Sequence, residues 1–160
     1  MSLGKIRALT DAMLRLWREA SRDRAGSPAV EFALIAPLLF LVLFGIVTFG
    51  IAINNYIELT DSVRSGGRAL AIARASTTPY TSTVSAIDAS APNLTAASIS
   101  IVVTVNGTPC ATDTLCATAL STAAGDTSTV TASYPCNLTV MQFNFAPNCS
   151  LSATTNDLIE

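Results

Sequence analysis

The stretch FALIAPLLFLVLFGIVTFGIAI, from Phe32 to Ile53, decides the fold class of this chain. No charged side chain occurs from Phe32 to Ile57, and a helix of these residues would be about 39 Å long at about 1.5 Å per residue. The hydrocarbon core of a bilayer is about 30 Å thick. A helix buried inside a soluble domain rarely runs this long without a polar face. The stretch therefore predicts a transmembrane helix.

The charges on the two sides of this stretch predict its orientation. Residues 1–24 carry a net charge of +3, whereas residues 75–160 carry −5 and contain no Lys or Arg. Basic segments next to a transmembrane helix are retained in the cytoplasm, so we expect a cytoplasmic N-terminus and an extracytoplasmic C-terminal region. Three arginines just beyond the helix count against this orientation, at positions 64, 68 and 74. The uncharged run is too long for a cleaved secretory signal, because the apolar region of such a signal spans only about 7–15 residues.

Composition excludes several classes of function. Only 12% of the residues are charged, against about 25% in soluble globular domains. The chain contains no His, which rules out His-based catalytic triads and His-ligated metal sites. A net charge of −2 provides no general attraction to nucleic acid. Since the sequence also lacks a phosphate-binding loop and paired catalytic carboxylates, we expect no enzyme, no cofactor, no metal site and no nucleic-acid partner.

Glu31 lies at the start of the apolar run, in the order Gly26-Ser27-Pro28-Ala29-Val30-Glu31-Phe32. A carboxylate at the start of a membrane helix is costly without a partner, and this makes it a functional residue by default. Alternatively, Glu31 lies in the first helical turn at the interface, where the helix dipole favours a negative charge. Both interpretations stay open on physical grounds.

The order of residues resembles the type IV prepilin pattern, in which a basic segment and Gly are followed by four residues, Glu, an aromatic residue and an apolar helix. The strings AGSPAVEFALIAPLLFLVLFGIVTFG and LTDSVRSGGRALAIARA resemble the TadE-like pseudopilins of tight-adherence (Tad, or Flp) pili. The resemblance is dense over residues 24–75. Beyond them it is looser, and the segments VTASYP at 130–135 and LSATT at 151–155 look like the two late strands of that family.

This resemblance implies a processing event and an assembly role. A prepilin peptidase would cut between Gly26 and Ser27, so that Glu31 becomes the fifth residue of the mature chain. The pair Glu31-Phe32 is similar to the Flp branch, and Glu31 would pair with the N-terminal amine of a neighbouring subunit. The implied partners are the inner membrane, the peptidase, other pilins and pseudopilins, and the Tad assembly machinery. The implied location is the bacterial inner membrane, crossed once, with a periplasmic head and the extracellular pilus as a further destination.

Length distinguishes the chain from the bulk filament subunit. Major Flp pilins have little beyond the helix, whereas this chain carries about 85 further residues. We therefore expect a minor pilin or pseudopilin that acts in pilus assembly. Two alternatives are an uncleaved, single-pass scaffold of the secretion apparatus and an adhesin displayed at the pilus tip, with a role in cell adhesion.

The expected fold is of the α+β class and pilin-like, with a long N-terminal helix and a small antiparallel β-sheet head held by disulfides. We expect four parts, listed in order: a cleaved leader at 1–26, a transmembrane helix at 27–57, a helical stalk at 58–76 and a β-rich head at 77–160. The helix should continue to Ser76, because Pro79 disfavours helical geometry in the residue before it. Along this stalk the expected apolar face consists of Ile57, Val63, Leu70 and Ala71. Gly66-Gly67 predicts a hinge or a point of close packing.

Within the head, the sequence predicts a short helix and several strands. The helix is expected near residues 80–89, and the strands at 98–105, 128–134, 138–145 and 151–159. Asn106-Gly107 is typical of a turn after the first strand. In the second strand, alternation should place Val130, Ala132 and Tyr134 on one face.

The four cysteines lie beyond the membrane stretch, at Cys110, Cys116, Cys136 and Cys149. Four cysteines allow three connectivities, and proximity in sequence favours Cys110–Cys116 and Cys136–Cys149. A zinc site does not fit the irregular spacing and the absence of His. Disulfides of this kind typically stabilise small extracytoplasmic domains by about 2–4 kcal/mol each.

Overall fold

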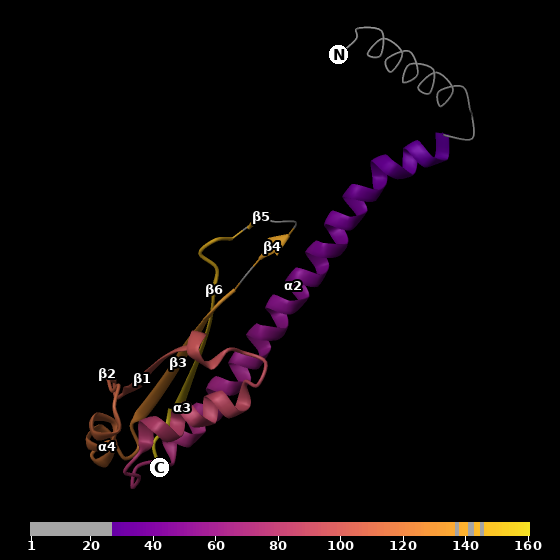
Figure 1. The fold of residues 1–160 in the computed structure, drawn as a ribbon. Helices are drawn as coiled ribbons and strands as arrows, with labels where there is room; N and C mark the ends of the chain where they lie inside the picture. The colour runs from indigo at the N-terminus through magenta and orange to yellow at the C-terminus, as the bar shows by residue number, and fades with distance from the viewer. Residues whose placement is uncertain (1–26, 137, 141–142, 145) are drawn as a thin grey trace, which may run out of the picture. The chain divides into compact units, whose positions relative to one another are not determined.

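The computed structural model describes residues 27–136, 138–140, 143–144 and 146–160 (Figure 1). The predicted leader at 1–26, including Gly26, lies outside these residues. The chain divides into two compact units, Met1–Gly45 and Ile46–Glu160. The four-part division expected from the sequence stays a prediction.

Helix α2 is the longest element and extends from Ser27 to Ala71. It is 45 residues long and continues through Pro37. Its most apolar 18-residue window has a mean hydropathy of 2.7, and none of that window is buried. The helix is therefore long and apolar enough to cross a membrane, as the Phe32–Ile57 run predicts.

The last turns of α2, within the second unit, bury one stripe of side chains. The buried residues of this part of α2 recur every three to four positions, at 59, 62–63, 66–67 and 70–71. This is the spacing of one helix face. Val63, Leu70 and Ala71 lie on this face as expected. Ile57 does not, because 55% of it is exposed, and the fully buried residue is Leu59. A two-residue step turns the helix by about 200°, so that only one of these two side chains can face the head.

Helix α2 ends at Ala71, five residues before the expected end at Ser76. The backbone N–H of Glu160 donates to the carbonyl oxygen of Ala71 at 3.1 Å. The N–H of Ala73 donates to the carbonyl oxygen of Leu70 at 3.0 Å, which closes a tighter turn. A contact with the end of the chain, which sequence periodicity does not reveal, thus replaces the next helical hydrogen bond.

The head contains a four-stranded antiparallel sheet of the order β2-β1-β3-β6. Its strands are β1 (Ser100–Val105), β2 (Thr108–Pro109), β3 (Thr127–Pro135) and β6 (Ser150–Leu158). The predicted α+β class is confirmed, and β1, β3 and β6 correspond to three predicted strands. The described part of the fourth predicted strand, at 138–145, is instead two short strands, β4 (Thr139–Val140) and β5 (Phe143–Asn144), which pair with each other and not with the four-stranded sheet.

Local chemistry explains the strand pattern. Asn106 and Gly107 both have positive φ angles, 48° and 76°, as a tight two-residue hairpin turn requires. This confirms the predicted turn, which aligns Val105 with Thr108. In β3, Val130 and Ala132 are fully buried and Tyr134 packs against the core, so the predicted alternation is also confirmed.

Two helices flank the sheet, α3 (Pro79–Ser90) and α4 (Asp113–Ser121), and a short 3₁₀ turn η2 (Ala96–Ser98) precedes β1. The sequence prediction for residues 80–89 matches α3. Helix α4 was not predicted, although a signal for its start exists. The Thr112 hydroxyl accepts a hydrogen bond from the N–H of Leu115 at 3.4 Å, and Asp113 occupies the first turn, a typical helix-start pattern.

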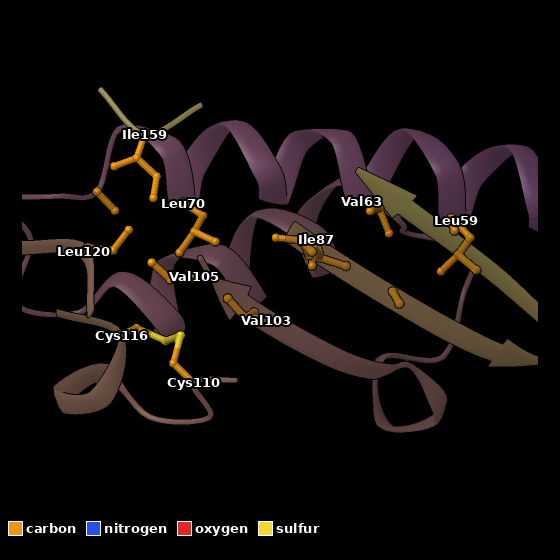
Figure 2. Packing of buried hydrophobic residues seen from close by; sticks show 14 of the residues in the cluster. Leu59, Val63, Leu70, Ile87, Val103, Val105, Cys110, Cys116, Leu120 and Ile159 are labelled. Carbon is orange, nitrogen blue, oxygen red and sulfur yellow. A yellow bond between two sulfur atoms is a disulfide. The ribbon is translucent and has the colours of Figure 1, made fainter. Parts of the chain in front are cut away.

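One hydrophobic core joins these elements within the second unit (Figure 2). Leu59, Val63 and Leu70 of α2 meet Ile87 of α3 and Leu120 of α4. The sheet contributes residues from three strands, namely Val103, Val105, Val130, Ala132 and Ala153. The end of α2 is thus an integral part of the head core.

The Gly66-Gly67 pair is a point of close packing. A Cβ atom at Gly66 would lie 2.5 Å from Cγ1 and 2.8 Å from Cδ1 of Ile87. At Gly67 it would collide with the Asp157 carboxylate and the Thr155 methyl group. Of the two interpretations left open by the sequence, close packing therefore describes this pair, because both sides of the helix backbone approach neighbouring elements.

Candidate functional site

Glu31 is the fifth residue of α2 and is exposed. The first turn of α2 contains no acidic residue, so Glu31 lies about one turn, or about 6 Å, beyond Ser27 along the axis. The effect of the helix dipole falls off within the first turn. This placement weakens the alternative in which the dipole alone accounts for Glu31. Of the two residues at the predicted processing site, Ser27 begins α2 and Gly26 lies outside the described residues.

The surface around Glu31 and further along α2 is apolar and open. Phe32 is 65% exposed, and the rings of Phe40 and Phe44 stack with centroids 6.4 Å apart. Side chains on every side of the helix are exposed, including Leu34, Leu38, Leu41, Ile46, Phe49 and Ile53. Such a surface is stable only against lipid or against other apolar helices.

The head is tied to α2 by a contact that sequence analysis missed. Glu58 accepts two hydrogen bonds from Asn93, one from the backbone N–H at 2.7 Å and one from Nδ2 at 3.1 Å. The residues are 35 positions apart, so no local pattern could reveal the contact. It holds the segment after α3 against the helix, immediately beyond the uncharged run.

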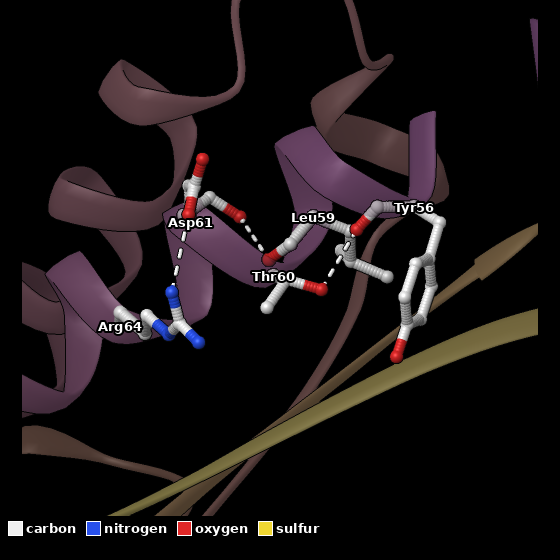
Figure 3. Close-up of polar contacts among 6 residues, drawn as sticks. Tyr56, Leu59, Thr60, Asp61 and Arg64 are labelled. Atoms are coloured by element: carbon white, nitrogen blue, oxygen red, sulfur yellow. Dashed lines mark hydrogen bonds and ion pairs between the residues drawn. The ribbon is translucent and has the colours of Figure 1, made fainter. Parts of the chain in front are cut away.

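The exposed side of α2 next to this contact carries only weak polar interactions (Figure 3). Asp61 and Arg64 form an ion pair of 3.6 Å, and both side chains are 65% exposed. Thr60 Oγ1 donates to the carbonyl oxygen of Tyr56 at 2.8 Å. Exposed ion pairs contribute about 0–1 kcal/mol, so Asp61 can be changed without disturbing the fold.

A second polar contact links the two head helices. Asp113, the first residue of α4, accepts hydrogen bonds from the hydroxyl of Thr81 at 2.6 Å and from its backbone N–H at 2.8 Å. The Thr81 hydroxyl and then its N–H lower the pKa of the Asp113 carboxyl below its ordinary value of 3.8, because both favour the ionised form.

This lowered pKa predicts an acid-sensitive contribution to stability. Because the folded pKa lies below the unfolded one, the contribution is present above pH 3.8 and is lost as the pH falls through the folded value. Asp113→Asn should therefore lower the urea midpoint at about pH 5 more than at about pH 3. The measurement is urea unfolding of the full chain in detergent at both pH values. An equal decrease of the urea midpoint at both pH values would contradict a stabilising role for the ionised Asp113 carboxylate.

The disulfides are paired as proximity predicts, Cys110 with Cys116 and Cys136 with Cys149. The first pair is buried in the head core beside Leu120 (Figure 2). The second closes the segment that contains β4 and β5. All cysteines among the described residues are thus in disulfides.

An apolar groove of about 260 Å³ lies in the second unit, beside the second disulfide. Helix α2 supplies Phe49, Ala52, Ile53 and Tyr56, and the opposite wall consists of Cys136, Leu138, Cys149 and Leu151. Sequence analysis did not predict this groove, because its two walls are far apart in the chain.

Comparison with known families gives a match to the family described as TadE-like protein, over residues 26–68. The similarity covers the N-terminal helical segment and does not extend into the rest of the head. The resemblance found in the sequence is confirmed over this segment, which contains Gly26, Glu31, the apolar run and the start of the head-facing stripe. Neither the curated proteins nor the solved structures contain a match to the chain. The matched segment contains most of the apolar stretch of α2, which is long and apolar enough to cross a membrane.

Proposed function

We propose that this TadE-like chain is a pseudopilin-like protein for the assembly of Tad/Flp pili, and that a prepilin peptidase processes it after Gly26. The observation that carries the proposal is the TadE-like match, which begins at Gly26 and extends along an apolar helix that is exposed on all sides. Lipid covers this surface before assembly, and the helices of neighbouring subunits cover it afterwards. No catalytic step of its own is part of this role.

Glu31 acts as the registration charge in this proposal. Hydrolysis of the Gly26–Ser27 peptide bond frees the Ser27 amine, which becomes a positive charge at the start of the mature helix. In surroundings of low dielectric constant an unpaired carboxylate is expensive, and an opposite charge is strongly oriented toward it. A subunit therefore docks where its Glu31 meets the amine of a neighbour, and this sets the axial position of the helix.

The head follows the helix into the assembly. Leu59, Val63 and Leu70 of α2 belong to the same core as the sheet, and Glu58 holds the segment at Asn93. The end of α2 and the head therefore enter the assembly together, and the head is presented outside the membrane, in the periplasm.

Two substitutions in the full chain, made in the cell, test processing and assembly separately. Gly26→Val should leave the chain uncut, whereas Gly45→Val should be cut normally, because a Cβ at Gly45 has open space around it. Glu31→Gln should be cut but should not enter pili, since loss of one partner from a buried ion pair costs about 3–5 kcal/mol. Asp61→Asn is the matched control, because the ion pair of Asp61 with Arg64 is exposed.

Immunoblots for processing and electron microscopy for pili provide the readouts. Normal pili in both Gly26→Val and Glu31→Gln would refute the pseudopilin mechanism. An uncut wild-type chain with pili that depend on Glu31 would instead support the single-pass scaffold of the secretion apparatus.

An adhesin at the pilus tip is the second candidate, and the outer face of the sheet favours it. This face is uncharged and rich in hydroxyl groups: the Thr131 and Thr154 hydroxyls lie 3.0 Å apart, and Thr129 Oγ1 donates to Asn156 Oδ1 at 2.6 Å. Thr131→Lys with Thr154→Lys should then abolish attachment of piliated cells while pili still form. Unchanged attachment would exclude adhesion through this face.

A further inference from the structure

Strand β6 lies at one end of the four-stranded sheet, and its far side is open. It is nine residues long and pairs with β3 at consecutive positions without a bulge. Among the residues that the structure describes, no strand lies on its other side. A long edge strand presents a row of unpaired N–H and C=O groups, which is a template for pairing with another chain.

The hydrogen bonds just outside the two ends of β6 show which of its residues face the open side. The N–H of Cys136 donates to the carbonyl oxygen of Cys149 at 3.1 Å, and the N–H of Ile159 donates to the carbonyl oxygen of Asp126 at 2.9 Å. Successive residues of an antiparallel strand direct their backbone groups to opposite sides, so the odd-numbered residues face β3. The residues that face the open side are Ser150, Ser152, Thr154, Asn156 and Leu158. All of them are exposed and uncharged.

The opposite end of the sheet is closed to such pairing. Strand β2 has only two residues, and Thr108 lies opposite Val105 of β1. The N–H of Cys110 donates to the carbonyl oxygen of Val103 at 2.9 Å, so that Pro109, between Thr108 and Cys110, faces outward. Proline has no N–H, and short length and proline are two devices that keep an edge strand unpaired. Strand β6 has neither, which indicates that its edge is meant to be paired.

One charged residue limits what a partner strand can carry. Asp157 is half-buried on the inner side of β6 and accepts a hydrogen bond from the Thr155 hydroxyl at 3.2 Å. Like charges directly opposite each other on neighbouring strands are destabilising. A strand added to β6 therefore carries no acidic side chain next to Asp157, and a Lys or Arg at that point would pair with it.

The direction of α2 argues against a second copy of the chain as the partner. Helix α2 runs in the same direction as β6, because Tyr56 lines the same groove as Leu151 and Gly67 approaches Thr155. One edge strand pairs symmetrically with its own copy across a two-fold axis, and in an antiparallel pair this axis reverses both strands. The two α2 helices would then also be antiparallel, whereas two copies inserted alike in one membrane have parallel helices.

We propose that the open side of β6 receives an extended strand from a different protein of the pilus assembly, which becomes the fifth strand of the sheet. Backbone hydrogen bonds to the even-numbered residues provide the affinity, as in other cases of strand addition. The partner segment has free N–H groups at alternate positions and no acidic residue beside Asp157. The inference rests on the proposed function, since assembly is what brings other proteins to the head.

Hydrogen–deuterium exchange of the full chain tests this proposal at single amides. The chain is measured in its native membrane with the Tad machinery present, and alone in phosphatidylcholine vesicles. We expect the N–H groups of Ser152, Thr154 and Asn156 to exchange about tenfold or more slowly in the native membrane, because they become hydrogen-bonded there. The N–H groups of Ala153 and Thr155 face β3 and should exchange equally in both settings.

Thr154→Pro and Thr154→Val form a matched pair that separates the backbone from the side chain. Proline removes an N–H on the open side and no hydrogen bond to β3, and an edge strand tolerates it there. We expect normal processing after Gly26 and a urea midpoint near that of the wild type, but several-fold fewer pili and no slow exchange at Ser152 and Asn156. Thr154→Val keeps the N–H and should behave as the wild type does.

Four results would overturn the proposal. They are equal exchange at the open-side amides in both settings, equal numbers of pili in the two variants, a large fall of the urea midpoint in Thr154→Pro, and slow exchange already in the vesicles. The third would mean that the Thr154 N–H bonds within the sheet, and the fourth that the partner is a second copy. Normal processing and Glu31-dependent pili with an unprotected β6 would refute strand addition alone, whereas an uncut chain would refute the proposed function.

Discussion

Leu59→Ala is expected to destabilise the head by about 2–5 kcal/mol, which is the usual cost of removing a buried leucine side chain. Leu59 is 0% exposed and lies in the core with Val63 and Ile87. The change leaves a cavity that the neighbouring strands fill only in part. The measurement is urea unfolding of the full chain in detergent, followed by near-UV circular dichroism of Tyr80 and Tyr134, which pack against this core.

Ile57→Ala is the control that makes the result specific. It removes a similar volume two residues away, but Ile57 is 55% exposed, and exposed substitutions usually change stability by about 0.5 kcal/mol or less. A comparable loss of stability in Leu59→Ala and Ile57→Ala would mean that α2 packs on the head with another face. A loss in Ile57→Ala alone would support the face expected from the sequence and contradict the structure.

Gly66→Val is the second large effect, with an expected loss of about 1–3 kcal/mol from overpacking. A Cβ at Gly66 would lie 2.5 Å from Cγ1 of Ile87, and Ile87 is fully buried in the core. The two γ-methyl groups of valine enlarge this collision. The loss should appear as a lower urea midpoint in the same assay.

Arg68→Val controls for the β-branched side chain, since it places the same residue on the exposed side of the same helix. We expect its midpoint to lie near that of the wild type. If Gly66→Val were as stable as Arg68→Val, the close approach of α2 and α3 at this point would be wrong. A double-mutant cycle with Ile87→Ala tests the contact: the double variant should lose less stability than the sum of the two single losses, because Ile87→Ala removes the atoms that collide with the valine side chain at position 66.

Much of the fold was predictable because periodicity reports local structure directly. The uncharged run made α2 evident, and the alternation of Val130 and Ala132 in β3 marked the buried side of the sheet. Asn106-Gly107 marked its turn because both residues tolerate positive φ angles. Each of these features depends on neighbours in sequence.

The features that were missed depend on contacts between distant residues. Ile57 and Leu59 are equally apolar, and only the packing of the sheet selects Leu59. The end of α2 at Ala71 depends on a hydrogen bond from Glu160. The segment 138–145 has strand composition, but its two halves pair with each other as β4 and β5 instead of joining the sheet.

The same distinction between local patterns and distant contacts applies to the candidate site. Gly26, Glu31 and Phe32 were found because they form a short linear pattern, and the TadE-like match covers all three. The contact of Glu58 with Asn93 and the groove beside Cys136–Cys149 were not found, because each joins residues from separate elements. Only the folded chain brings them together.

The most direct test of the central claim is the intact mass of the protein extracted from its native membrane. Processing after Gly26 predicts a chain that begins at Ser27 and is lighter than the 16.6 kDa precursor by the mass of residues 1–26. Sequencing of its N-terminal peptide should read Ser-Pro-Ala-Val-Glu-Phe. A chain that retains residues 1–26 in membranes with assembled Tad pili would contradict the account.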